Sequence, residues 1–332
     1  MNVSKIASLA AAVGTLFVSG SAFAQALVKV DGSSTVFPIT EAVAEEFQKA
    51  KKGSVRVTVG ISGTGGGFKK FCRGETDVSN ASRPILDKEM ADCKAAGIKY
   101  IELPVAFDAL TVVMNPKNAF LKQLTVEELK KMWEPAAQTK ITKWREVNAA
   151  WPETGLKLFG PGADSGTFDY FTEAVVGKAK SSRGDFTASE DDNVLVQGVS
   201  RDAGGLGYFG FAYYIENKDK LKAVPIVNPK TGKAVEASLE TVISGEYQPL
   251  SRPIFIYVNA ASVDKPEVKE FVEFYLKNAS ALTKEVKYVP LADADYTHAL
   301  NNFAKKKTGT AFGGHSEVGV KVSDLLKRDP KE

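Results

Sequence analysis

Clusters of glycine, serine and threonine occur at three points where a short apolar run passes into an amphipathic segment. They are Gly32–Thr35, the ISGTGGG stretch that starts at Ile61, and Asp164–Thr167. A predicted strand precedes each cluster and a predicted helix follows it, which places each cluster at a helix N-terminus. Helix N-termini leave backbone N–H groups unpaired and carry partial positive charge, and they therefore attract anions. Three such ends meeting at one point would surround a small anion with neutral donors.

Each cluster also has a purely structural interpretation. A serine or threonine at the start of a helix commonly caps that helix. The glycines of the second cluster are also compatible with an ordinary turn. Because the same arrangement occurs three times, each time after a strand, the sequence favours a shared binding site over three unrelated caps.

Arg83 is the first candidate for a fixed cation at such a site. A multiply charged anion favours arginine, because the planar guanidinium matches two oxygens at once. Arg83 stands directly before Pro84 in the segment NASRPIL, and a solvated surface arginine is the alternative interpretation. Arg201 is a weaker candidate, for which an ion pair at the surface or between lobes is the simpler role.

The first 24 residues have the features of a cleaved secretory signal. Lys5 precedes an apolar run from Ile6 to Val18, and the segment ends on Ala22-Phe23-Ala24. The apolar run is shorter than the roughly 20 residues that span a bilayer. We therefore expect a soluble, periplasmic mature chain that begins near Gln25. Its near-neutral charge, +3 for the whole chain, gives no support for a nucleic-acid partner.

The two cysteines of the chain, Cys72 and Cys93, are predicted to form one disulfide, because exported proteins fold in an oxidising compartment. Closing a loop of this length contributes about 3 kcal/mol on the chain-entropy estimate. The bond would brace the segment from Gly74 to Met90, which contains Arg83.

Short β-branched runs alternate with amphipathic segments and indicate an α/β fold with parallel strands. Thr125 and Glu128 are spaced as a capping box at the start of a helix. Two long apolar runs, 105–115 and 253–259, are predicted to carry the chain between two lobes. The first lobe would then comprise residues 25–108 and 256–332, and the second residues 109–255; one larger doubly wound sheet is the alternative. The strand runs are LVKV (27–30), VRVTVGI (55–61), LKLF (156–159) and AVPIV (223–227).

Over essentially the whole mature chain, the sequence resembles the periplasmic phosphate-binding proteins of ABC phosphate importers, which are type II solute-binding proteins. The motifs that carry the resemblance are GSSTVFPI (32–39), GISGTGGGFKKFC (60–72), NASRPI (80–85) and DSGTFDYF (164–171). The resemblance implies two α/β lobes joined by two hinge strands that close over a dehydrated phosphate in the cleft. It also implies delivery to the membrane permease subunits of an importer, and we expect a monomer.

Position by position, the resemblance implies ligands from all three clusters. The second cluster would provide Thr64, with Gly63 and Ser62 less certain, because the glycine spacing allows two alignments. The first cluster would provide Ser34, Thr35 and Val36, the last through its backbone N–H, and the third would provide Ser165, Gly166 and Thr167.

The chain departs from the best-known branch of that family at two positions. Arg83 stands where that branch has an aspartate that accepts the proton of hydrogen phosphate, and Pro161-Gly162-Ala163 stands where it has an arginine. The two changes look coupled. The positively charged side chain of the site would be Arg83 in this chain, in place of an arginine just before the third cluster. Asp164 is the nearest candidate for the proton acceptor; pairing with Arg83 or capping the helix are equally reasonable roles for it.

The sequence offers little for catalysis. Ser165 has Ala163 two residues before it, so the G-x-S-x-G elbow is absent. The two histidines, His298 and His315, stand in polar surroundings and are expected at the surface. With two cysteines bonded to each other, no clustered metal ligands remain. We expect no enzyme activity, metal or cofactor; the alternatives are a site for sulfate, molybdate, tungstate or arsenate, a phosphatase or hydrolase, and a structural or adhesive surface protein.

Overall fold

The computed structural model describes residues 25–163, 165–189, 191–315, 317 and 321–331. The predicted secretory signal and Asp164 lie outside these residues.

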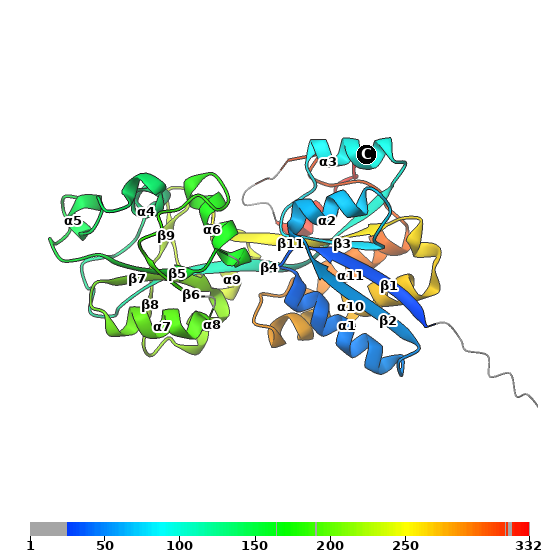
Figure 1. Ribbon diagram of the computed structural model, residues 1–332, viewed down its shortest axis with the longest axis horizontal. Coiled ribbons are helices and arrows are strands. Elements are labelled where there is room, and N and C mark those ends of the chain that lie inside the picture. Colours follow the sequence, from blue (N-terminus) through cyan, green and yellow to red (C-terminus); the bar gives the residue numbers. More distant parts are fainter. Residues whose placement is uncertain (1–24, 164, 190, 316, 318–320, 332) are drawn as a thin grey trace, which may run out of the picture.

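A continuous sheet runs the length of the molecule, in the order β2-β1-β3-β11-β4-β7-β5-β6, with β8 also beside β4. Figure 1 shows helices packed around each half of this sheet, so that two α/β lobes lie on either side of the middle. The strands are β1 (Ala26–Gly32), β2 (Val55–Ile61), β3 (Val78–Ala81), β4 (Tyr100–Met114), β5 (Lys157–Pro161), β6 (Thr187–Ser189), β7 (Gly205–Gly210), β8 (Lys222–Ala223), β9 (Ile226–Val227), β10 (Ala234–Val235) and β11 (Ser251–Asn259).

β4 and β11 join the two lobes. They pair antiparallel from Tyr100 to Ala109 of β4, and β4 then continues into the other lobe, where Leu110 to Met114 pair with β7. The backbone N–H of Leu110 donates to the carbonyl of Leu250 at 2.9 Å, just before β11 begins. The apolar run 105–115 thus passes between lobes within β4 except for its last residue, and the run 253–259 lies within β11.

Helices cover both faces of each half of the sheet (Figure 1). They are α1 (Phe37–Ala50), α2 (Gly63–Phe71), α3 (Asp87–Ala95), α4 (Val126–Trp133), α5 (Trp144–Val147), α6 (Gly166–Val176), α7 (Asp192–Arg201), α8 (Phe211–Glu216), α9 (Leu239–Ile243), α10 (Pro266–Glu285), α11 (Asp293–Ala304) and α12 (Val322–Leu325). Short 3₁₀ turns lie at Pro135–Ala137 and Ser262–Asp264.

The C-terminal helices pack onto the N-terminal part of the chain. Phe47 of α1 meets Phe271 of α10 with ring centroids 5.4 Å apart, and both rings are buried. A second cluster surrounds Phe68 and Tyr257, at 4.9 Å, beside the disulfide. One lobe is thus assembled from both ends of the chain.

Several local predictions are confirmed. Cys72 and Cys93 are disulfide-bonded. Thr125 and Glu128 form the capping box, with Glu128 N donating to Thr125 Oγ1 at 3.1 Å and Thr125 N donating to Glu128 Oε2 at 3.0 Å. The AVPIV run is not one strand: it divides into β8 and β9 at Pro225, which has no N–H to donate to a neighbouring strand.

Candidate functional site

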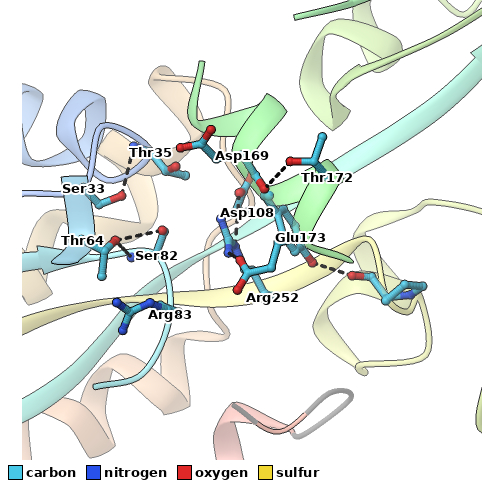
Figure 2. Close-up of polar contacts among 12 residues, drawn as sticks. Ser33, Thr35, Thr64, Ser82, Arg83, Asp108, Asp169, Thr172, Glu173 and Arg252 are labelled. Atoms are coloured by element: carbon cyan, nitrogen blue, oxygen red, sulfur yellow. Dashed lines mark hydrogen bonds and ion pairs between the residues drawn. The ribbon is translucent and has the colours of Figure 1, made fainter. Parts of the chain in front are cut away.

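The three clusters lie at the carboxyl ends of parallel strands. β1 pairs parallel with β2 and β3, so the segments that follow these strands emerge at one edge of the first lobe. In the second lobe, β5 leads through the third cluster into α6. A cavity of about 170 Å³ opens between them, and Figure 2 shows several of its polar side chains. Its lining comprises Ser33, Ser34, Thr35, Gly63, Thr64, Gly65, Ser82, Arg83, Gly166, Asp169, Glu173, Ala179 and Arg252.

The first cluster is held by its own backbone and by β3. Ser33 N donates to the carbonyl of Asn80 at 3.0 Å, and Thr35 N donates to Ser33 Oγ at 3.2 Å. Val36 is the buried N-cap residue of α1, and its side chain cannot cap the helix. Among the described residues, no hydrogen bond uses the backbone N–H of Ser34 or Val36. These two donors are therefore available to a ligand.

In the second cluster, Thr64 lines the cavity, and Ser62 is engaged elsewhere. Thr64 Oγ1 accepts from Ser82 N at 3.1 Å and lies 3.1 Å from Ser82 Oγ, which ties α2 to the loop after β3. Ser62 donates its hydroxyl to Asp31. Gly63 adopts a φ of +73°, a conformation that favours glycine at the start of α2.

The third cluster, in the second lobe, contacts the first cluster, in the first lobe. Ser165 caps α6, its Oγ accepting from Thr167 N at 3.2 Å. A Cβ atom added to Gly166 would overlap Thr35 Oγ1 and lie 3.2 Å from Thr35 N. Thr167 lines an adjoining cavity with Pro38 and others. Glycine is needed at position 166, because the start of α6 and the first cluster are in direct contact.

Arg83 lies beside the second cluster, already paired. Its Nη1 and Nη2 donate to the two carboxylate oxygens of Glu89 at 2.9 and 2.8 Å, and Nη1 also donates to the carbonyl of Pro84 at 3.1 Å. A Cβ on Gly65 would lie 3.8 Å from Arg83 Nη2. Glu89 therefore fixes the guanidinium next to the first turn of α2. Arg201 is exposed at the end of α7, away from the cavity.

A second arginine, which the sequence analysis did not identify, lines the same cavity. Arg252 of β11 lies over the ring of Tyr170 at 3.7 Å, with Nη1 3.3 Å from Glu173 Oε2 and Nε 3.6 Å from Asp108 Oδ2. Figure 2 shows Arg252 between these two carboxylates. The signal that could have found it is a repeated tetrapeptide, because SRPI occurs at 82–85 and again at 251–254.

Burial raises the pKa of two carboxyl groups near the cavity, Asp108 and Asp169. Burial raises the pKa of Asp108 to about 6, and the guanidinium of Arg252 partly opposes this rise. Burial also raises the pKa of Asp169, an effect that the charges of Lys180 and Arg252 oppose and that of Glu173 reinforces. Each arginine faces at least one carboxylate, so the cavity carries little net positive charge and its donors are largely neutral.

An apolar cavity of about 240 Å³ adjoins this site and shares Arg83, Glu173 and Arg252 with it. Phe107 and Phe312 are among its lining residues. Within the described residues there is no cluster of His, Cys, Asp or Glu that could hold a metal ion. His298 and His315 are exposed, as expected. None of the helices in that part of the chain is long and apolar enough to cross a membrane.

Comparison with known proteins places the chain in a family. The model of the PBP superfamily domain matches residues 17–279. Protein SphX of Synechococcus elongatus is 56% identical over 322 residues, 97% of this chain and 94% of that protein. The phosphate-binding protein PstS of Staphylococcus saprophyticus is 43% identical over 273 residues, 81% of this chain and 82% of that protein.

The fold agrees with a solved structure. A crystal structure described as "a possible phosphate binding protein" from Planctomyces limnophilus is 52% identical, with a TM-score of 0.79 over 85% of this chain and 98% of that one. The expected periplasmic-binding-protein fold of two α/β lobes joined by two strands is confirmed. The chain belongs to the PBP superfamily, in the family that includes the PstS phosphate-binding proteins and the SphX proteins.

Proposed function

We propose that this protein captures inorganic phosphate between its two lobes and delivers it to an ABC phosphate importer. The observation that carries the proposal is a cavity at which the N-termini of α1, α2 and α6 meet, lined by hydroxyl groups of the first lobe and by Gly166 of the second. Related proteins named as phosphate-binding support the choice of anion.

The proposed site uses mostly neutral donors. Helix N-termini and hydroxyls stabilise a dehydrated anion without requiring an excess of cationic side chains. Arg83 and Arg252 add positive charge, each oriented by a carboxylate partner. We assign phosphate contacts to Ser34, Thr35, Val36, Gly63, Thr64, Arg83, Ser165, Gly166 and Thr167 as predicted, and we add Arg252; Asp164, also predicted, lies outside the described residues.

Capture occurs by rotation of one lobe against the other. We propose lobes made of residues 25–108 and 256–332, and of residues 109–255, with bending where β4 and β11 pass between them. Hinge closure around a ligand is a common motion of two-lobed binding proteins. Contact between Gly166 and Thr35 marks the point where the lobes meet over the anion.

The role is binding and transport without catalysis. The relatives are named as binding proteins, and we infer that the chain has no enzyme activity. The first 24 residues would direct export and be removed near Ala24-Gln25, which leaves a periplasmic monomer whose partners are the permease subunits in the membrane.

Isothermal titration of the ligand-stripped mature protein tests this proposal. Phosphate should bind with 1:1 stoichiometry, and a large excess of sulfate should leave that binding almost unchanged. Heat from sulfate alone, or none from phosphate, would refute phosphate as the ligand. Added phosphate esters should remain unhydrolysed; turnover would show an enzyme.

A further inference from the structure

An ion pair and a ring contact join the two lobes outside the anion cavity. Lys287 belongs to the first lobe, and its Nζ lies 2.6 Å from Oε2 of Glu216 in the second. The same Nζ lies over the ring of Tyr213, 4.9 Å from its centroid. Figure 1 shows α10, which precedes Lys287, and α8, which carries Tyr213 and Glu216, in different lobes. We call these three residues the interlobe latch; none of them lines the anion cavity.

The backbone at the end of α10 determines where Lys287 stands. Lys287 N donates to the carbonyl of Lys284 at 3.0 Å, and Tyr288 N donates to the carbonyl of Thr283 at 2.9 Å. This pair of hydrogen bonds is a Schellman motif, which ends a helix with a left-handed residue. Lys287 is that residue, with a φ of +66°. Because glycine is the usual residue at such a position, the lysine side chain can be removed there without disturbing the turn.

The end of α11 repeats this arrangement within one lobe. Lys306 has a φ of +48°, and the backbone N–H groups of Lys306 and Lys307 make the same two hydrogen bonds. Lys306 Nζ lies 2.6 Å from Oδ1 of Asp264, which belongs to the first lobe as Lys306 does. Lys306 is therefore a matched control for Lys287, with the same turn and the same ion-pair distance but a partner in its own lobe.

Contacts between the lobes favour the form of the protein in which they are made. The latch is present together with the contact between Gly166 and Thr35, where the lobes meet over the anion site. Rotation of the lobes away from each other would separate Lys287 from Glu216. When only a fraction of a protein is in the form that binds, its apparent affinity is reduced by that fraction. A contact made in the closed form therefore raises affinity without touching the ligand.

We propose that Lys287 is a positioning residue for phosphate capture: by pairing with Glu216 and lying over Tyr213, it holds the lobes together and slows the release of phosphate. This inference rests on the proposed function and assigns part of the affinity to residues outside the anion cavity. The side chains of Lys287 and Glu216 are 39% and 50% exposed. Exposed ion pairs and cation–π contacts each contribute modestly, so the latch should change the dissociation constant about three- to tenfold.

Lys287→Gly tests the proposal, because it removes the latch and suits the backbone. We expect the phosphate dissociation constant to rise about three- to tenfold, mainly through faster release. The unfolding temperature without phosphate should stay at or above that of the wild type, since glycine is favourable in this turn. Titration calorimetry measures the affinity, and stopped-flow kinetics measures the release rate of phosphate. Lys306→Gly should leave the affinity and the release rate unchanged.

Reversing the charges of the pair makes the result specific to the contact between lobes. Lys287→Glu and Glu216→Lys should each weaken phosphate binding, because each places like charges together. The two substitutions combined should restore most of the affinity. Because salt screens exposed charges, the difference between the wild type and Lys287→Gly should also shrink in about 0.5 M salt.

The outcomes separate this inference from the proposed function. If the wild type binds phosphate and Lys287→Gly has the same affinity and release rate, the latch does not act in capture, and phosphate capture still stands. An equal loss in Lys306→Gly would also overturn the inference, because the effect would not depend on a contact between lobes. If the wild type binds no phosphate, the proposed function fails and the inference with it. A loss in Lys287→Gly that Lys306→Gly lacks and that the reversed pair recovers supports the inference.

Discussion

Arg83 and Arg252 resemble each other in sequence and in environment. Each belongs to an SRPI tetrapeptide, and each guanidinium is oriented by an acidic partner, Glu89 for Arg83 and Glu173 for Arg252. The side chains are 20% and 15% exposed, which leaves them little water to lose when the cavity closes. Preorientation of this kind lowers the entropic cost of binding an anion.

Replacing Arg252 with alanine should weaken phosphate binding by about 2–5 kcal/mol, the range for truncating one member of a buried charged pair. We expect a similar loss for Arg83→Ala. Titration calorimetry measures both, and Arg145→Ala, on an arginine whose side chain is 60% exposed on α5, is the control. A loss below about 0.5 kcal/mol for either cavity arginine would remove it from the phosphate site.

Asp108 makes stability depend on pH. Its folded pKa of about 6 lies above the ordinary value of 3.8, so the folded state holds the proton more tightly than the unfolded state. The stabilisation is complete below pH 3.8 and is lost as pH rises through about 6. Two pKa units correspond to about 3 kcal/mol.

Urea unfolding of Asp108→Asn between these pH values tests that claim, in the absence of phosphate. The difference in unfolding free energy, wild type minus variant, should decrease as pH rises. A difference that is constant with pH, or that increases, would show that Asp108 does not titrate in this window.

At the scale of elements, the start of α6 determines how closely the lobes approach. Gly166→Ala would place a methyl group against Thr35, although alanine is acceptable to the helix itself. We expect phosphate affinity to fall at least tenfold, about 1.4 kcal/mol or more, with little change in thermal stability.

Gly184→Ala is the matched control for that substitution, because an added Cβ there meets only Gln138 Oε1 at 3.7 Å, an ordinary contact. Equal phosphate affinity in Gly166→Ala and Gly184→Ala would mean that the lobes do not close on this contact.

The helix N-termini could be predicted because the features that form them are local. Strand, glycine-rich cluster and helix follow one another within a few residues, and β2 (Val55–Ile61) has the bounds of the predicted run. A disulfide between the only two cysteines also required no knowledge of the fold. The position of Arg252 beside Glu173 was not predictable in this way, because the two residues are far apart in sequence and meet only when β11 and α6 pack together.

The sequence also could not predict which acidic side chain pairs with which arginine. Asp164 was considered as a partner of Arg83, whereas Glu89, on a helix that follows Arg83 directly, occupies both of its Nη atoms. Asp169 lies inside the quoted DSGTFDYF motif, yet only the direction of α6 shows that its carboxylate faces the cavity.

At the scale of the whole molecule, both lobes contribute to one cavity, and the strands β4 and β11 pass between them. When residues of both lobes bind one ligand, the ligand makes its full set of contacts only in the closed form. Ligand binding therefore favours lobe closure. The large core cluster includes buried residues from both halves of the sheet. We expect each lobe to move as a unit about β4 and β11.

Small-angle X-ray scattering of the ligand-stripped protein, with and without phosphate, measures that motion directly. We predict a smaller radius of gyration with saturating phosphate and no change with the same concentration of sulfate. An unchanged radius with phosphate, under conditions where calorimetry shows that phosphate is bound, would contradict capture by lobe closure.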